Sequence, residues 1–168
     1  MEWLYFMLNL EVLQGAKLNA IGRAAAMCWI HFGDLIEIES RSGVRTVGQY
    51  ALDVDCPWRI RCNSKILLAS SDMFEPASTH QNDEPFDWDI QGNNLFDERA
   101  TMLCSKEPII TVRSVELSPT YDLKITFSND CILEVFVCGS TDAEQWRLFE
   151  PGKSKSYFVV TGYGLIDL

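Results

Sequence analysis

Residues 121–138 read Tyr-Asp-Leu-Lys-Ile-Thr-Phe-Ser-Asn-Asp-Cys-Ile-Leu-Glu-Val-Phe-Val-Cys, and this stretch decides the fold. Apolar and polar residues alternate from Tyr121 to Phe127, which is the pattern of a strand with one buried face. Ser128-Asn129-Asp130 then forms a turn, because Asn and Asp tolerate a positive φ, and residues 131–138 are rich in β-branched side chains. The stretch therefore predicts a β-hairpin packed on a hydrophobic core.

Short strand-like segments lie on both sides of this hairpin. They cover residues 17–24, 26–32, 35–39, 51–56, 58–62, 66–70, 109–117 and 157–161, and Gly, Pro, Asn or Ser divides the chain between them. Strands joined by short connections are antiparallel, since a parallel pair needs a crossover of about a dozen residues or more. The sequence thus predicts hairpins or a meander arranged as a sandwich-like or barrel-like sheet.

Residues 94–104 form the clearest helical segment. Asn94 can cap the helix, acidic residues lie near its positive dipole end, and Pro108 prevents its continuation. Its apolar face consists of Leu95, Phe96, Ala100 and Leu103. A weaker helical pattern covers Glu2–Leu13, within an N-terminal extension of residues 1–16. We therefore expect a single α+β domain over residues 1–168, mainly antiparallel β-sheet, with one or two short helices.

The composition excludes several classes of protein. Of the 168 residues, 47% are hydrophobic and 23% are charged, with a formal net charge of −10. These values are typical of one compact soluble domain and not of a disordered, collagen-like or coiled-coil chain. An acidic chain repels phosphate, so we expect no nucleic-acid partner. No apolar run approaches the roughly 18 residues needed to cross a bilayer, so we expect no membrane partner.

Six cysteines are scattered along the chain: Cys28, Cys56, Cys62, Cys104, Cys131 and Cys138. Their irregular spacing contains no C-x-x-C pair and matches no zinc template. Most lie within apolar runs, where a free cysteine packs as a small hydrophobic side chain. The pattern predicts buried, reduced thiols and a cytoplasmic location, without a metal or other cofactor.

Residues 72–98, called the acidic segment below, carry most of the net charge. They contain neither Lys nor Arg, and their acids are Asp72, Glu75, Asp83, Glu84, Asp87, Asp89, Asp97 and Glu98. Two prolines and the lack of periodicity predict a long loop over residues 72–93, and loops of this length are usually functional or disordered. An acidic surface attracts basic partners. We therefore expect a basic protein to bind the carboxylates Asp72, Glu75, Asp83, Glu84, Asp87, Asp89 and Asp97.

A cation-binding module is the first alternative. Asp87, Asp89 and Glu98 take positions 1, 3 and 12 of a calcium-loop template, Gln91 takes position 5, and Gly92 takes position 6. Three features oppose this reading. Position 5 is not Asp or Asn, position 8 is the polar Asn94, and Pro85 breaks any helix that would enter the loop.

Catalysis is the second alternative. The chain has only two histidines, His31 and His80, and it contains no G-x-S-x-G elbow, P-loop or dinucleotide fingerprint. The sequence therefore identifies no catalytic residue and favours a protein that is not an enzyme. A small hydrolase-like enzyme with a carboxylate base near Asp72 stays an alternative, because paired carboxylates leave no sequence signature.

Trp88 stands between two acids, Asp87 and Asp89, in the middle of the acidic segment. Such a ring either anchors a partner or packs on its own domain. Ile90, Leu95 and Phe96 follow closely, so we expect Trp88 to form a local apolar cluster with them. This cluster would hold the acidic loop against the sheet.

Several blocks of the chain form a familiar pattern between Lys17 and Gly164. They are Ile21-Gly22-Arg23-Ala24, Phe32-Gly33, Tyr50-Ala51-Leu52, Cys56-Pro57-Trp58-Arg59-Ile60, Ser71-Asp72, Asp87-Trp88-Asp89, Gly92-Asn93-Asn94-Leu95-Phe96-Asp97, Leu133-Glu134-Val135-Phe136, Glu144-Gln145-Trp146-Arg147-Leu148-Phe149 and Phe158-Val159-Val160-Thr161-Gly162. This pattern resembles an uncharacterised family of small bacterial proteins, to which no activity is attached. In size and charge such proteins look like immunity proteins encoded beside toxins. The expectation is therefore a non-catalytic acidic binding protein, of the type that inhibits a basic toxin.

Overall fold

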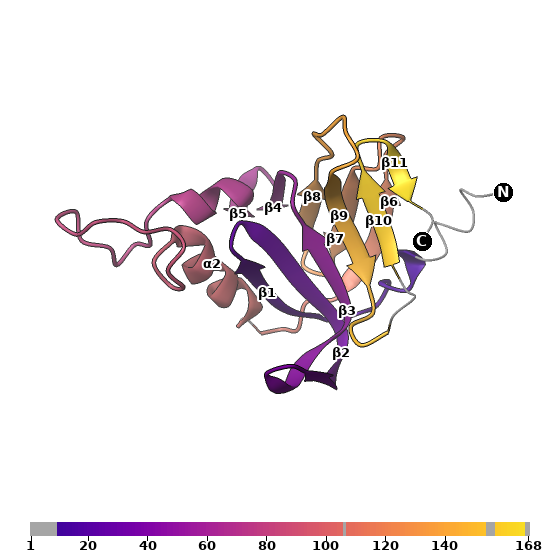
Figure 1. Ribbon diagram of the computed structural model, residues 1–168, viewed down its shortest axis with the longest axis horizontal. Helices are drawn as coiled ribbons and strands as arrows, with labels where there is room; N and C mark the ends of the chain where they lie inside the picture. The colour runs from indigo at the N-terminus through magenta and orange to yellow at the C-terminus, as the bar shows by residue number, and fades with distance from the viewer. Residues whose placement is uncertain (1–9, 106, 154–156, 167–168) are drawn as a thin grey trace.

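The computed structural model describes residues 10–105, 107–153 and 157–166. Its body consists of a six-stranded and a five-stranded antiparallel sheet, and the 3-10 helix η1 (Ser70–Phe74) and the α-helix α2 (Leu95–Cys104) lie at one end (Figure 1). This arrangement confirms the predicted α+β fold, which is mainly antiparallel sheet. Within the described residues, no helix is both long and apolar enough to cross a membrane.

The strands of each sheet follow a simple spatial order. The six-stranded sheet has the order β1 (Leu18–Ala24), β2 (Met27–Ser40), β3 (Gly43–Val54), β9 (Glu144–Phe149), β10 (Tyr157–Thr161) and β11 (Gly164–Ile166). The five-stranded sheet has the order β5 (Lys65–Ala69), β4 (Trp58–Cys62), β8 (Cys131–Val135), β7 (Leu123–Phe127) and β6 (Val112–Leu117).

One hydrophobic core fills the space between the two sheets. It contains Ile30 and Leu52 from the first sheet together with Ile60 and Leu133 from the second. Trp146 on β9 is fully buried, and its indole Nε1 donates to the carbonyl of Tyr121 at 3.0 Å, just before β7. The two sheets are therefore packed face to face and linked across the core by a hydrogen bond.

The predicted hairpin is present as β7 and β8. Leu123, Ile125 and Phe127 are buried, and Ile125 lies opposite Leu133 on β8. In the turn, Asp130 adopts a φ of +64°. The alternation of residues thus identified the strand and its buried face.

Two predicted strands are one long strand in the structure. β2 pairs with β3 along nearly its whole length, with a shift in register between Phe32 and Leu35. Gly33 lies in this β-bulge with a φ of +83°, a conformation that glycine adopts without strain. The glycine that predicts a break between two strands therefore marks a bulge within one.

The sequence pattern does not predict β9 or β11. In β9, Glu144 and Arg147 form an ion pair beside the buried Trp146 and Leu148, so the strand lacks a clean alternation of polar and apolar residues. Its position between β3 and β10 stabilises it instead. The helix predicted over residues 2–13 falls, apart from its last few residues, outside the described residues.

Cys62 on β4 and Cys131 on β8 form a disulfide. The prediction that all six cysteines are reduced is therefore wrong for this pair. The two residues lie directly opposite each other in the sheet, although 69 positions separate them in the sequence, so their spacing could not indicate the bond. Disulfides are rare in cytoplasmic proteins, and this one counts against the predicted location. The other four cysteines are free.

Candidate functional site

The acidic segment runs from η1, through a long loop, into the first turn of α2. Figure 1 shows this loop extending from the end of the molecule where η1 and α2 lie, away from the two sheets. The predicted loop and the predicted helix are both present, and the helix begins directly after its cap, Asn94. Most of the acidic side chains are thus carried on a projection of the fold.

Backbone contacts close the base of this loop. The amide of Ala77 donates to the carbonyl of Asn93, and the amide of Leu95 donates to the carbonyl of Glu75, both at 2.8 Å. Between them, Pro76 pairs with Asn94 in an isolated antiparallel bridge. The chain therefore leaves and returns at one point, as in an Ω-loop.

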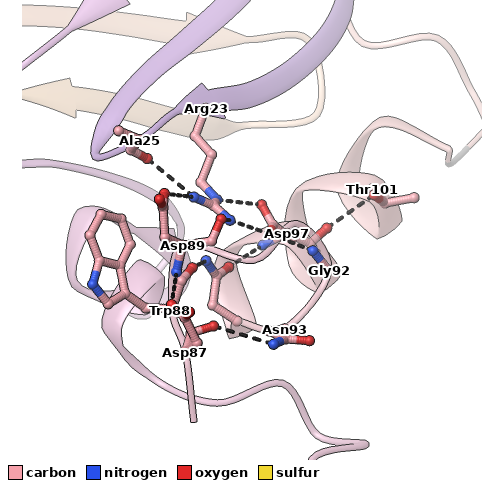
Figure 2. Close-up of polar contacts among 10 residues, drawn as sticks. Arg23, Ala25, Asp87, Trp88, Asp89, Gly92, Asn93, Asp97 and Thr101 are labelled. Carbon is pink, nitrogen blue, oxygen red and sulfur yellow. Dashed lines mark hydrogen bonds and ion pairs between the residues drawn. The ribbon is translucent and has the colours of Figure 1, made fainter.

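Arg23, near the end of β1, anchors the returning half of the loop (Figure 2). Its Nε and Nη2 donate to the two carboxylate oxygens of Asp97 at 2.9 and 3.0 Å, which is a bidentate pair. Nη2 also donates to the carbonyl of Asp89 at 3.2 Å, and Nη1 donates to the carbonyl of Ala25 at 3.3 Å. The guanidinium therefore connects β1, the loop and α2.

The pair formed by Arg23 and Asp97 is buried. Their side chains are only 2% and 4% exposed. The hydrogen bond to Asp97 holds the pKa of Arg23 above its ordinary value, although burial acts in the opposite direction. A buried pair of this kind holds its elements in one arrangement, because separating the partners would leave an uncompensated charge in the interior.

Asp97 also organises the start of α2. Its Oδ2 accepts a hydrogen bond from the amide of Gly92 at 2.8 Å, and its own amide donates to Oδ1 of the cap Asn94 at 2.9 Å. Gly92 has a φ of +90°, so a residue without a Cβ suits this turn. The carboxylate lies in the first turn of α2, at the positive end of the helix dipole, where a negative charge stabilises the helix.

The ring of Trp88 packs on its own domain, against Arg23 and Phe74. The guanidinium carbon of Arg23 lies 5.9 Å from the centre of the half-buried Trp88 ring, and Phe74 meets that ring edge-on at 5.1 Å. Ile90 is 54% exposed, and Phe96 packs on Trp58. Phe96, one member of the predicted apolar cluster, therefore packs on Trp58, while Trp88 packs on Phe74 and Arg23.

Two further acids stabilise the ends of the segment. Asp72 accepts a hydrogen bond from the amide of Ala69 at 2.9 Å and pairs with Arg99 at 3.3 Å. Glu98 accepts hydrogen bonds from the amide and the hydroxyl of Ser78, both at 2.7 Å, and these bonds lower its pKa. Both carboxylates thus have structural partners.

The predicted partner-binding residues therefore fall into two groups. Asp97 is buried and Asp72 is mostly buried in its pair with Arg99, so neither contributes to an open acidic surface. The exposed carboxylates of the predicted set are Glu75, Asp83, Glu84, Asp87 and Asp89. Phe74, next to Glu75, is 53% exposed and adds an apolar contact surface.

The three acids of the calcium-loop template do not converge on one point, because each has its own contacts. Asp87 accepts from the amide of Asp89 at 3.0 Å, the Asp89 carboxylate lies 3.5 Å from Nη1 of Arg23, and Glu98 binds Ser78. In residues 10–105, 107–153 and 157–166 no group of three or more His, Cys, Asp or Glu side chains is arranged to hold a metal ion.

The structure places a carboxyl group with a strongly raised pKa on β3, away from Asp72. Burial raises the pKa of Asp53 to about 6, although Arg147 opposes the shift. Asp53 lies on β3, opposite Trp29 on β2 and Arg147 on β9. The group with a pKa suited to a carboxylate base is therefore Asp53, which the sequence did not single out.

Sequence reasoning did not identify Arg23. No local pattern marks it, because its partners Asp89 and Asp97 lie 66 and 74 positions further along the chain. A lone arginine in an otherwise uncharged strand was the only available signal.

Comparison of the chain with family models, with curated proteins and with solved structures gave no match.

Proposed function

We propose that this protein is a non-catalytic binding protein whose acidic segment docks on a basic protein. The observation that carries the proposal is the set of five exposed carboxylates, Glu75, Asp83, Glu84, Asp87 and Asp89, on one projecting loop. Lys and Arg are absent from the acidic segment, and the two arginines that pair with it bind Asp72, Asp89 and Asp97. In the described part of the chain Glu75, Asp83, Glu84 and Asp87 form no ion pair, and we infer that their charges meet the partner.

A clustered charge of one sign acts mainly on the rate of association. It attracts a basic partner over a distance of about one Debye length, roughly 8–10 Å at moderate salt, and aligns it before contact. Such steering weakens as salt is added. The exposed ring of Phe74 beside Glu75 supplies an apolar contact that can contribute once the partner is bound.

The anchor at Arg23 makes this loop a defined surface. The closed base of the loop and the buried Arg23–Asp97 pair fix where the carboxylates are presented. A partner then meets a loop that needs little ordering, which lowers the entropic cost of binding. A basic toxin, inhibited by an immunity-type protein, is the partner class that the size and charge of the chain favour.

Pull-down from cells that make the protein naturally tests this proposal. The bait is the wild-type protein, with Glu75→Gln/Asp83→Asn/Glu84→Gln as the test variant. The matched control is Glu37→Gln/Glu39→Gln/Asp142→Asn, which removes three exposed acids from other surfaces. We expect the wild type and the control to capture a basic protein at low salt, to lose it at high salt, and the test variant to capture little. Equal capture by the test variant and the control would contradict the proposal.

A further inference from the structure

A second feature, independent of the acidic segment, is a cavity of about 420 Å³ at the other end of α2. Its wall comes from the start of β1, the bulge of β2 at Gly33 and Asp34, the last residues of α2, and Ser105, Glu107, Ile109 and Ile110. This volume lies in the range of small-molecule sites, roughly 300–1,000 Å³.

Backbone hydrogen bonds frame this cavity. The amide of Leu18 donates to the carbonyl of Ile110, and the amide of Gly33 donates to the carbonyl of Lys17, both at 2.8 Å. The bulge moves Asp34 out of the regular ladder between β2 and β3. Bulges often re-aim side chains beside functional sites. The hollow is therefore built into the backbone.

The lining has an apolar part. Leu18, Leu103 and Ile110 are buried and line the cavity. Leu35 and Ile109 line it too, yet they remain 64% and 55% exposed. Large apolar side chains that stay exposed beside a cavity are typical of surfaces that contact a ligand.

The lining also carries charges of both signs. They belong to Lys17, Asp34 and Glu107, and in the described part of the chain none of the three forms an ion pair or a side-chain hydrogen bond. Asn19 donates its side-chain amide to the carbonyl of Gly33, which fixes its amide oxygen as an acceptor in the same wall.

We propose that this cavity binds a small zwitterion with an apolar side chain, of the chemical class of the apolar α-amino acids. Lys17 would pair with the carboxylate of the ligand. Asp34 and Glu107, with the amide oxygen of Asn19, would receive its ammonium group. The apolar wall formed by Leu18, Leu103 and Ile110 would take its side chain. A ligand with only one of the two charges would leave part of this set unpaired.

Calorimetry with three related probes tests the proposal on the full chain. Phenylalanine carries both charges, 2-phenylethylamine lacks the carboxylate, and 3-phenylpropanoate lacks the amine. We expect phenylalanine to bind at least about tenfold more tightly than either analogue, the equivalent of one lost charge pair of about 1.4 kcal/mol. No heat with phenylalanine at millimolar concentration, or equal binding of all three probes, would overturn the proposal.

Paired variants assign the charges. Lys17→Gln should weaken phenylalanine binding about tenfold and leave 2-phenylethylamine unchanged, while Asp34→Asn/Glu107→Gln should weaken phenylalanine and leave 3-phenylpropanoate unchanged. Lys65→Gln and Asp142→Asn are matched controls, because both residues are exposed and neither lines the cavity. All these positions are exposed, so the variants should fold, and their melting temperatures verify this. Equal affinity for phenylalanine in the variants and the controls would refute the assignment.

A chemical readout locates the ligand without relying on heat. Cys104 lines the cavity and is half-buried, whereas Cys138 is exposed and does not line it. Phenylalanine should slow the alkylation of Cys104 by iodoacetamide and leave that of Cys138 unchanged. Unchanged alkylation of Cys104 at saturating phenylalanine would show that the ligand binds elsewhere.

Discussion

Arg23 is the residue on which the placement of the acidic segment depends. Replacing it with Met leaves Asp97 as a buried charge without its partner, and such a change typically costs about 3–5 kcal/mol. We expect Arg23→Met to lower the free energy of unfolding by this amount, measured by urea denaturation. Arg113→Met is the control, because Arg113 and its partner Asp130 are 52% and 76% exposed, and surface pairs contribute about 1 kcal/mol or less. A similar loss in both variants would contradict the anchoring role.

Replacing Trp88 should lower the stability of the protein less than replacing a fully buried tryptophan would. Its ring contacts Arg23 and Phe74 but is only half-buried, so Trp88→Ala should cost about 1–3 kcal/mol of unfolding free energy. Ile90→Ala, two positions away and 54% exposed in the wild type, should stay within about 0.5 kcal/mol of wild type. Chemical denaturation of the two variants compares them directly. Equal stability of both variants would show that Trp88 does not hold the loop.

The raised pKa of Asp53 predicts that the stability of the protein depends on pH. Its pKa is about 6 in the folded protein against an ordinary value of 3.8, because burial disfavours the charged form. The folded state therefore holds this proton more tightly, and its stability falls as the pH rises from about 4 to about 6. Asp53→Asn should be more stable than wild type at pH 7.5, by about 1 kcal/mol after allowance for solvent screening, and equal to it near pH 4. Urea denaturation at both pH values checks this, and a loss of stability at pH 7.5 would mean that Arg147 outweighs burial.

At the scale of elements, the disulfide between β4 and β8 ties together two hairpins of the five-stranded sheet. It closes a loop of 69 residues, and bonds that close long loops typically contribute about 2–4 kcal/mol. We expect Cys62→Ser to lower the unfolding free energy by this amount and Cys138→Ser, at a free and exposed thiol, to leave it nearly unchanged. Thiol titration of the unreduced, denatured protein should find four free cysteines. Six would show that the bond is absent.

At the scale of the whole molecule, the shared core predicts cooperative unfolding. Both sheets contribute to one cluster of buried residues, and Trp146 links them through its bond to the carbonyl of Tyr121. Loss of either sheet would expose the inner face of the other. Far-ultraviolet circular dichroism and tryptophan fluorescence should therefore give one common denaturation midpoint. Two separate midpoints would show that the sheets unfold independently.

The sequence by itself determined the local structure of this protein. Alternation over Tyr121–Phe127 identified the hairpin, the cap at Asn94 identified the helix, and two prolines with the lack of periodicity identified the loop over residues 72–93. These signals are local, because strand period, capping and the effect of proline depend on neighbours within a few residues.

The tertiary structure alone decided which acids remain free. Asp72, Asp97 and Glu98 resemble the other acids in sequence, but Arg99, Arg23 and Ser78 engage them in the fold. It likewise decided that Cys62 and Cys131 meet and that the start of β1, the bulge of β2 and the end of α2 enclose a cavity. The physical reason is the same in each case. Partners separated by tens of positions are brought together by strand order and packing, and no local pattern encodes that order.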